Sequence, residues 1–160
     1  MKRSSHMSEA DSVYMGVAKA HATLSKATRL KVGACIVTPS RVIIPGINGQ
    51  PKPLGNVCER DGVTKASVIH AELNCILKAQ REGIKIEGAT LYVTHSPCDH
   101  CASLIIETGI SDGVWELKHP SLWTNAMKRA CSKIKPTKFG IELEIQIGRA
   151  SCRERVLRLV

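Results

Sequence analysis

The sequence predicts an α/β fold in which a five-stranded mixed sheet is covered by helices on both faces, in a three-layer α/β/α arrangement. Two observations support this prediction. Segments typical of strands alternate with segments of helical periodicity, in the order α-β-β-α-β-α-β-α-β. The chain has 160 residues, of which 43% are hydrophobic and 3% aromatic, so it can bury one compact and mainly aliphatic core.

The first half of the chain predicts a helix, a hairpin and a long loop. Apolar residues such as Val13 and Val17 recur at helical spacing over residues 8 to about 26. The runs KVGACIV and RVIIPGI are rich in β-branched residues and are joined through Pro39 and Ser40, which predicts an antiparallel hairpin. The following NGQPKPLGN contains two prolines and two glycines, and it predicts a loop of the kind that often covers a site.

The second half predicts alternating helices and strands. Helical periodicity begins at His70 and stops at Gly83, and GATLYVTH is a predicted buried strand. SPCDHCASLIIETG predicts a helix that Ser96 caps, with Pro97 in its first position and Gly109 at its end. The last predicted elements are a strand at DGVWEL, a helix over residues 121–131 and a strand at GIELEIQI, whose alternation leaves one face in water.

Both ends of the chain are predicted to lie outside the folded domain. Residues 1–6 resemble an expression leader with the natural start at Met7, and residues 149–160 resemble a disordered or vector-derived tail. These segments contribute +2 and +3 to the formal net charge of +9, which leaves +4 for a single domain over residues 7–148. This charge suits a phosphate-bearing metabolite as well as a polynucleotide, or a solvated surface with no specific partner.

Seven cysteines occur in a chain that shows no signal peptide and no apolar run near the roughly 20 residues of a membrane span. The sequence therefore predicts a cytoplasmic protein, in which a disulfide framework is not expected. Cys35 and Cys75 lie in apolar runs and are predicted to be small buried residues. Cys98 and Cys101 belong instead to the motif PCDHC.

The PCDHC motif predicts two ligands of a zinc ion. At positions i and i+3 of a helix start, the Cys98 and Cys101 thiolates lie on one face, and the helix N-terminus stabilises their negative charge. Asp99 and His100 project away from that face and are interpreted as non-ligands. A catalytic zinc takes a third protein ligand and leaves one position for water.

The segment IHAEL supplies the third ligand. His70 and Glu72 can share one site only if His70 stands at the extreme N-terminus of its helix, because residues i and i+2 otherwise point to nearly opposite sides. The preceding GVTKASV is not helix-like, so we expect this arrangement. Zinc with two thiolates and one neutral imidazole is neutral, which leaves Glu72 free to move protons.

A redox dithiol and a structural zinc site are the other interpretations of a CxxC pair, and both are more common for an isolated pair. A structural site usually shows a second CxxC or an HxxxH, which this chain lacks. A redox role leaves the His-Ala-Glu motif unexplained. His-x-Glu followed by Pro-Cys-x-x-Cys is the known signature of zinc-dependent nucleobase deaminases, so we favour a catalytic zinc.

With these motifs in place, the sequence resembles the cytidine/deoxycytidylate deaminase superfamily, and above all its deoxycytidylate (dCMP) deaminase branch. The similar segments are KVGACIV, GINGQPKPLGN, HAELNCIL and EGATLYVTHSPCDHCASLIIETGI. The resemblance implies a cytidine deaminase-like fold and hydrolytic deamination of dCMP to dUMP and ammonia, which supplies dUMP for dTMP synthesis. It also implies that Glu72 takes a proton from zinc-bound water, protonates N3 of the base and helps ammonia leave.

The resemblance also implies substrate contacts. By matching motifs, Asn48 binds the sugar–phosphate side of the nucleotide and the Ala71 backbone N–H binds the base, although Asn-Gly is also a turn signal by itself. Arg29 matches a basic position that could touch phosphate. Where many members carry a tyrosine pair, Trp115 and His119 stand here, so base stacking and phosphate contacts are expected to differ.

The implied cofactor is one catalytic Zn²⁺ per chain. A second, structural zinc is not expected, because residues 56–69 are too few for the insert that holds it in some relatives and Cys58 lacks a set of partners. The implied partners are the substrate dCMP, the effectors dCTP and dTTP, and further copies of the chain in a homo-oligomer, from dimer to hexamer. No membrane partner is expected.

Two other classes of function stay open. One is a deaminase of another base or of a polynucleotide, such as guanine, cytosine, transfer RNA or single-stranded DNA. Nucleic-acid binding is not favoured, because it calls for a basic groove with stacking aromatics and the chain has five aromatic residues. The other is a non-catalytic zinc-stabilised protein, against which the intact Glu72 argues.

Overall fold

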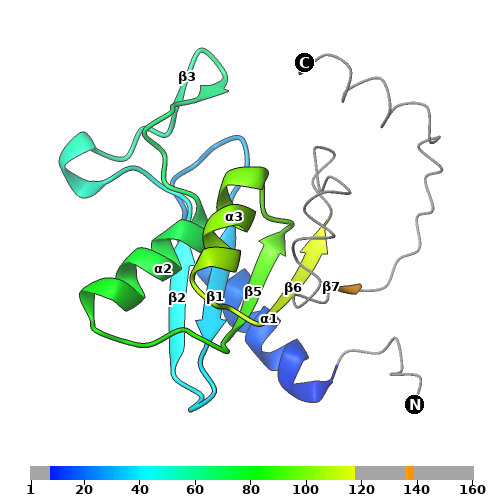
Figure 1. Ribbon diagram of the computed structural model, residues 1–160. Helices are drawn as coiled ribbons and strands as arrows, with labels where there is room; N and C mark the ends of the chain where they lie inside the picture. The colour runs from blue at the N-terminus through cyan, green and yellow to red at the C-terminus, as the bar shows by residue number, and fades with distance from the viewer. Residues whose placement is uncertain (1–7, 118–135, 139–160) are drawn as a thin grey trace, which may run out of the picture.

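The computed structural model describes residues 8–117 and 136–138 of the chain (Figure 1). The helices are α1 (Glu9–Ala22), α2 (Ala71–Arg81) and α3 (Asp99–Glu107), with a short 3₁₀ helix η1 (Lys52–Leu54). The strands are β1 (Gly33–Val37), β2 (Ile43–Ile47), β3 (Glu59–Arg60), β4 (Val63–Thr64), β5 (Thr90–His95), β6 (Asp112–Leu117) and β7 (Pro136–Lys138). None of the described helices is both long and apolar enough to cross a membrane.

The main sheet has the strand order β2-β1-β5-β6-β7 and mixes both kinds of pairing. β1 runs antiparallel to β2 and to β5, whereas β6 runs parallel to β5 and to the three-residue β7. The predicted α/β fold with a mixed sheet is therefore confirmed. The predicted helix over residues 121–131 and the predicted strand GIELEIQI lie outside the described residues, so the five-strand arrangement with that last strand stays a prediction.

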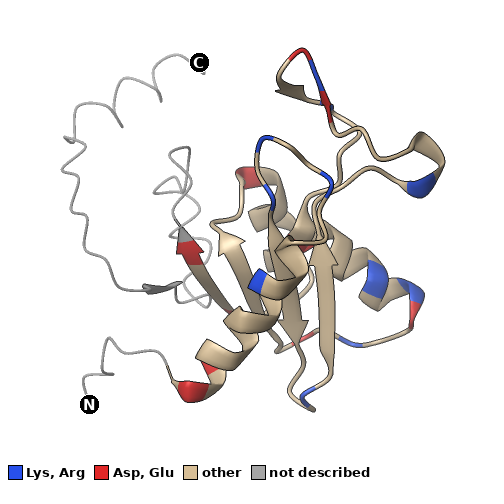
Figure 2. Ribbon diagram, turned by 180° about the vertical axis from the view of Figure 1, so that it is seen from behind, with Lys and Arg blue, Asp and Glu red and all other residues tan. Residues whose placement is uncertain are grey.

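Helices lie on both faces of this sheet, and the central strand β1 shows how they are covered. Ala34 and Ile36 pack with residues of α2 and α3 in one core cluster, while Cys35 and Val37 pack with α1 in a second one. Successive residues of a strand point to opposite faces, and every residue of β1 is buried. Figure 1 shows α2 and α3 on the near face of the sheet, and Figure 2, the view from behind, shows α1 on the other.

Two strand glycines allow the helices to approach the sheet closely. A Cβ atom on Gly33 would lie 2.0 Å from the backbone oxygen of Ala18 in α1. A Cβ atom on Gly46 would lie 2.6 Å from the backbone oxygen of Ala71 in α2, although real Cβ contacts are essentially never shorter than 3.0 Å. On each face of the sheet, a helix therefore packs directly against a strand glycine.

Local signals set most helix ends as predicted. Ser8 caps α1 through a capping box with Asp11. Gly83 and Gly109 follow α2 and α3 with φ angles of 66° and 75°, which glycine adopts without strain. The two predicted glycine stops are confirmed.

Two predicted boundaries are wrong. α1 ends at Ala22 rather than near residue 26, because the chain turns inward at Ser25, whose hydroxyl donates to the backbone oxygen of Asn48. The N-cap of α3 is Cys98 and not Ser96. Cys98 is still extended, with φ −75° and ψ 170°, so the first helical residue is Asp99, and Pro97 does not hold the predicted first position of the helix.

A short hairpin, β3–β4, follows the predicted loop of residues 48–56 and precedes α2. Its two strands pair antiparallel across Asp61 and Gly62, which both have positive φ angles, as a type I′ turn requires. Asp-Gly is a hairpin signal, but the flanking residues lack the apolar alternation of a strand. The hairpin is therefore absent from the sequence prediction, and Figure 1 shows it standing away from the sheet.

Candidate metal centre

The N-termini of α2 and α3 come together on one face of the sheet. His70 is the N-cap residue of α2, Cys98 is the N-cap residue of α3, and Cys101 follows in the first turn. The His70 Nδ1 lies 3.5 Å from the Cys98 Sγ and 3.5 Å from the Cys101 Sγ, and the three donor atoms lie within 4.8 Å of one another. Asp99 and His100, interpreted as non-ligands, do not belong to this donor group.

The donor set fits a tetrahedral zinc ion. Zn–S and Zn–N bonds of about 2.3 and 2.0 Å at a tetrahedral angle place sulfur and nitrogen about 3.5 Å apart. Both S···N pairs have this separation. Three protein ligands leave a fourth position, and the exposure of His70 beside the half-buried Cys98 and buried Cys101 turns one side of the group to solvent.

Mutual hydrogen bonds shift the protonation of the three donors. Hydrogen bonds from Cys101 and His70 lower the pKa of Cys98 to about 3, so this thiol is ionised at neutral pH. The hydrogen bond to Cys98, together with burial, raises the pKa of Cys101. The hydrogen bond to Cys98 also raises the pKa of His70 above its ordinary 6.5, although burial opposes this shift. Ligands lose their protons on binding a metal, so a dication held here displaces the protons that these groups share.

Glu72 lies beside this group in the first turn of α2, with only 4% of its surface exposed. Its carboxyl group is hydrogen-bonded to Cys101. Burial raises the pKa of Glu72 above its ordinary 4.5, although its own backbone N–H and the charge on His70 act in the opposite direction. A buried carboxyl group with a raised pKa accepts a proton more readily than an exposed one, which suits a group that takes up and passes on protons.

Both helix N-termini favour negative charge at this place. The first N–H groups of a helix have no partner within it, and the helix dipole adds a partial positive charge. Ala71, the first residue of α2, is fully buried and carries one of these N–H groups. The geometry is therefore compatible with the predicted contact between the Ala71 N–H and the base.

Asn48, the predicted contact for the sugar–phosphate side, holds the loop that follows α1. Its Oδ1 accepts hydrogen bonds from the Ser25 hydroxyl at 2.7 Å and from the Val32 N–H at 2.8 Å. Its Nδ2 donates to the backbone oxygen of Leu30 at 2.8 Å. Within the described part of the chain, the second Nδ2 hydrogen of Asn48 has no hydrogen-bond partner. The predicted contact of Asn48 with the substrate would use this hydrogen, and it stays a prediction.

Of three other residues that the sequence singled out, the two that the structure describes stand outside the donor group. Arg29 is exposed in the loop after α1, and its predicted phosphate contact stays a prediction. Trp115 is buried in the core cluster that also contains Cys101, and so lies in the hydrophobic interior. His119 lies outside the described residues.

Two side chains that the sequence analysis did not single out, Ser25 and Glu59, form hydrogen bonds that hold the loop after α1. Ser25 binds Asn48, 23 positions away, and Glu59 binds Thr28, 31 positions away. Neither residue belongs to a motif, and a periodic pattern cannot reveal contacts over such separations. They become visible only when the strands have paired.

Comparison with known proteins agrees with this arrangement. The chain matches the family described as the cytidine and deoxycytidylate deaminase zinc-binding region over residues 8–117. The deoxycytidylate deaminase of Mycobacterium phage D29 is 37% identical over 120 residues, 66% of this chain and 92% of that protein. ComE operon protein 2 of Bacillus subtilis is 40% identical over 101 residues, 59% of this chain and 53% of that protein. The crystal structure of dCMP deaminase from cyanophage S-TIM5 in complex with dCMP and dUMP is similar with a TM-score of 0.75 at 29% identity, covering 84% of this chain and 100% of that one.

Proposed function

This chain belongs to the cytidine and deoxycytidylate deaminase zinc-binding family, and we propose that it is a hydrolase that converts dCMP and water to dUMP and ammonia. The observation that carries the proposal is the donor group of His70, Cys98 and Cys101 with the buried carboxyl group of Glu72 against it. The phage D29 relative is named for this activity, and the structural relative was solved with dCMP and dUMP, which supports the choice of substrate.

Glu72 moves the protons of the proposed reaction. His70, Cys98 and Cys101 would hold the zinc ion, which when bound would lower the pKa of a water molecule from 15.7 towards about 7. Glu72 takes up one proton from the attacking water and delivers it to N3 of the cytosine ring, which makes C4 more electrophilic, and the water oxygen bonds to C4. Glu72 then carries the second proton of that oxygen to the 4-amino group, which leaves as ammonia with the electron pair of the C4–N bond, so that C4 keeps the oxygen as the carbonyl group of dUMP. The raised pKa of Glu72 suits a group that must change protonation within each turnover.

Binding of the nucleotide is assigned to groups at the α2 N-terminus, directly after β2 and in the loop after α1. In this assignment the Ala71 N–H binds the base. The remaining Nδ2 hydrogen of Asn48 binds the sugar–phosphate side, and Arg29 binds the phosphate. The loop also carries Lys26 and Lys31, and Figure 2 shows its basic segments close to one another. Positive charge at the edge of a site raises the local concentration of an anionic substrate.

The proposed effectors dCTP and dTTP have a candidate place that adjoins the substrate groups, because Asn48 and Lys26 are among its lining residues. A hollow of about 700 Å³ lies between the loop after β2 and α2. Its charged lining residues are Lys26, Lys52, Lys78, Arg81 and Glu82. Four basic residues against one acidic residue suit the negative charge of a triphosphate.

One catalytic zinc ion per chain and assembly into a homo-oligomer complete the proposal. The described surface offers apolar side chains that another copy could cover, since Leu54, Val57 and Val63 are each more than half exposed. Burial of such side chains is the usual source of stability in homo-oligomer interfaces.

Ammonia release from a substrate panel tests the proposal. The panel contains dCMP, CMP, deoxycytidine, dCTP, guanine and single-stranded DNA, each with and without prior removal of metal by a chelator. We expect dCMP to be the preferred substrate and the activity to disappear with the metal. Preference for guanine or DNA would instead support a deaminase of another base or of nucleic acid.

A further inference from the structure

The loop between α1 and β1, residues 23–32, lies at the end of the sheet where β5 leads into the metal centre, since the Gly33 N–H after the loop donates to Thr94 Oγ1 near the end of β5, and the loop is held from two sides. It contains three basic residues and no acidic one. Its last residue, Val32, packs against the core cluster to which Cys101 belongs and against which Cys98 packs. On its inner side the loop is fixed by the three hydrogen bonds to Asn48.

On its outer side the α1–β1 loop is held by Glu59 of the β3–β4 hairpin. The Glu59 Oε1 accepts hydrogen bonds from the backbone N–H of Thr28 at 3.1 Å and of Arg29 at 3.3 Å, and Oε2 accepts from the Thr28 hydroxyl at 3.0 Å. The Arg29 Nη1 donates to Thr64 Oγ1 at 3.4 Å, and Thr64 is the cross-strand partner of Glu59. One cross-strand pair of the hairpin, Glu59 and Thr64, therefore forms hydrogen bonds to both the backbone and the side chain of Arg29.

The charge of Glu59 works against the attraction of a phosphate. Desolvation raises the pKa of Glu59, but hydrogen bonds from Thr28 and Arg29 outweigh it and hold the pKa below its ordinary 4.5, so the group is ionised at neutral pH. A negative charge beside Arg29 offsets part of the positive field that would attract a nucleotide. The geometric and the electrostatic effects of Glu59 on substrate binding therefore have opposite signs.

We propose that Glu59 is a positioning residue of the substrate site, which fixes the α1–β1 loop so that Arg29 is presented to the phosphate of the nucleotide. The proposal rests on the proposed function and extends it to a residue outside the family's zinc motifs. A loop that is already ordered loses less conformational entropy when the substrate binds, so the expected effect is on binding rather than on the chemical step.

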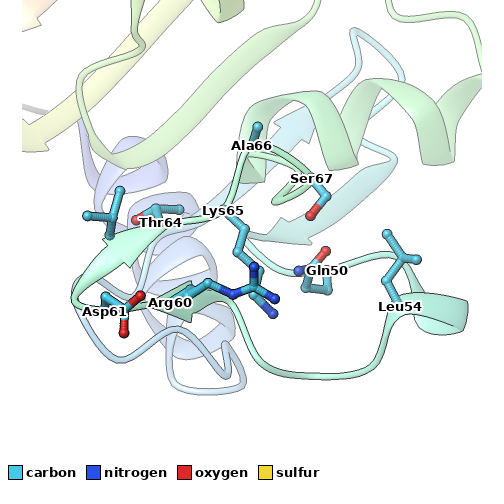
Figure 3. Close-up of a pocket in the computed structure, with 9 residues that line it drawn as sticks. Gln50, Leu54, Arg60, Asp61, Thr64, Lys65, Ala66 and Ser67 are labelled. Carbon is cyan, nitrogen blue, oxygen red and sulfur yellow. The ribbon is translucent and has the colours of Figure 1, made fainter.

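Three variants separate geometry from charge. Glu59→Ala removes the charge and all three hydrogen bonds, whereas Glu59→Gln removes the charge and keeps an acceptor for the two backbone N–H groups. Asp61→Asn removes the same charge at the turn of the same hairpin, where asparagine tolerates the positive φ angle (Figure 3). We expect Glu59→Ala to raise KM for dCMP about fivefold with kcat within about twofold, and the other two variants to leave KM within about twofold.

Trypsin cleavage after Lys26, Arg29 and Lys31, followed by mass spectrometry, gives a readout independent of turnover. We expect cleavage there to be roughly fivefold faster in Glu59→Ala only, with cleavage after Lys85 unchanged. An unchanged or lower KM for Glu59→Ala, an equal rise of KM in all three variants, or unchanged cleavage would overturn the positioning role. Wild-type protein that does not deaminate dCMP would contradict the proposed function instead, and the cleavage rates would still decide for or against Glu59.

Discussion

The two faces of the sheet are built alike but use their buried polar groups differently. Each face seats a helix on a strand glycine, Gly33 under α1 and Gly46 under α2. On the α1 face, the Tyr92 hydroxyl donates a hydrogen bond of 2.7 Å to Asp11, and the Tyr14 ring lies 5.3 Å from that of Tyr92. This polar pair is satisfied within the fold, so its expected effect is to stabilise the packing of α1.

On the α2–α3 face, the buried polar groups are ionisable and compete for protons. Burial raises the pKa of Glu72, and the hydrogen bond to Cys98 together with burial raises that of Cys101. Such groups reduce the stability of a fold unless a cation or a substrate satisfies them. The comparison indicates that polar groups on the α1 face contribute stability, whereas those on the α2–α3 face are retained for chemistry.

Replacement of Glu72 gives the largest expected effect. Glu72→Gln removes the proton carrier but keeps the size of the side chain, so we expect kcat for dCMP to fall about 10³-fold. Zinc content should be unchanged, and the temperature of unfolding unchanged or higher, because a buried ionisable group is replaced by a neutral one. Ammonia release, metal analysis and thermal unfolding measure these outcomes. The control is Glu107→Gln on exposed α3 surface, and a kcat of Glu72→Gln within tenfold of wild type would exclude the assigned role.

Two buried cysteines, one on each face, provide the second test. Cys101→Ser should lose zinc on dialysis against a chelator, and with it most of the activity, because the hydroxyl is a much poorer ligand than a thiolate. Cys35→Ser should keep zinc and activity and lose about 1 kcal/mol of stability. Cys35 is fully buried and donates to the backbone oxygen of Tyr14. Equal zinc loss in both variants would mean that burial, not position, decides metal binding.

Substitutions at Gly33 and Gly46 test whether a change on one face of the sheet affects the function of the other face. Gly33→Ala and Gly46→Ala should each destabilise the fold by about 1–3 kcal/mol, since the added Cβ atom meets helix backbone. Gly46→Ala should also weaken zinc binding, because the added Cβ atom pushes on Ala71 next to His70, the proposed ligand. Gly33→Ala should leave the zinc affinity of the folded protein nearly unchanged. Urea unfolding and competition with a zinc chelator give the two quantities, and equal losses of affinity would contradict the separation.

Tyr92→Phe gives the smallest expected effect and sharpens the assignment of the α1 face. Loss of the hydrogen bond to Asp11 should cost about 1 kcal/mol of stability without changing kcat or zinc content. Tyr14→Phe removes the same atom from the neighbouring ring and is the matched control, because the Tyr14 hydroxyl makes no hydrogen bond within residues 8–117 and 136–138.

The same pair predicts a dependence on pH. Burial raises the pKa of Asp11, but hydrogen bonds from Tyr92 and Ser8 outweigh it and hold the pKa below its ordinary 3.8. A lowered carboxyl pKa adds stability that is fully present above about pH 4 and is lost as the pH falls through the folded-state pKa. The stability difference between wild type and Tyr92→Phe should therefore narrow in acid. A difference that is constant with pH would show that the carboxylate charge is not involved.

The elements that the sequence predicted well carry their signals locally. Ser8 caps α1, and Gly83 and Gly109 end α2 and α3, because a cap or a positive φ angle depends on neighbouring residues. The cysteines of PCDHC are three positions apart and come together at any helix start. Their type and spacing left a redox pair and a metal site open, and the His-Ala-Glu motif favoured the metal site.

Where the sequence failed, a signal was weak or ambiguous. Pro97 is compatible with the first position of a helix, but Cys98 after it is still extended, so α3 begins only at Asp99. The Asp61-Gly62 turn was visible, yet two-residue strands show no periodicity. Asn48 was predicted to contact substrate, and the structure shows in addition that its amide holds three groups of the α1–β1 loop.

The sequence by itself determined the α/β alternation and the residues with metal-binding and proton-carrying chemistry, because these follow from residue type and short-range spacing. Only the tertiary structure decided that the His70 Nδ1 stands 3.5 Å from both cysteine sulfurs, with Glu72 beside them. The tertiary structure alone also decided that Glu59 holds a loop 31 positions away. The physical reason is that pairing of β1 with β5 and seating of α2 on Gly46 bring distant segments into contact, and no local pattern encodes those separations.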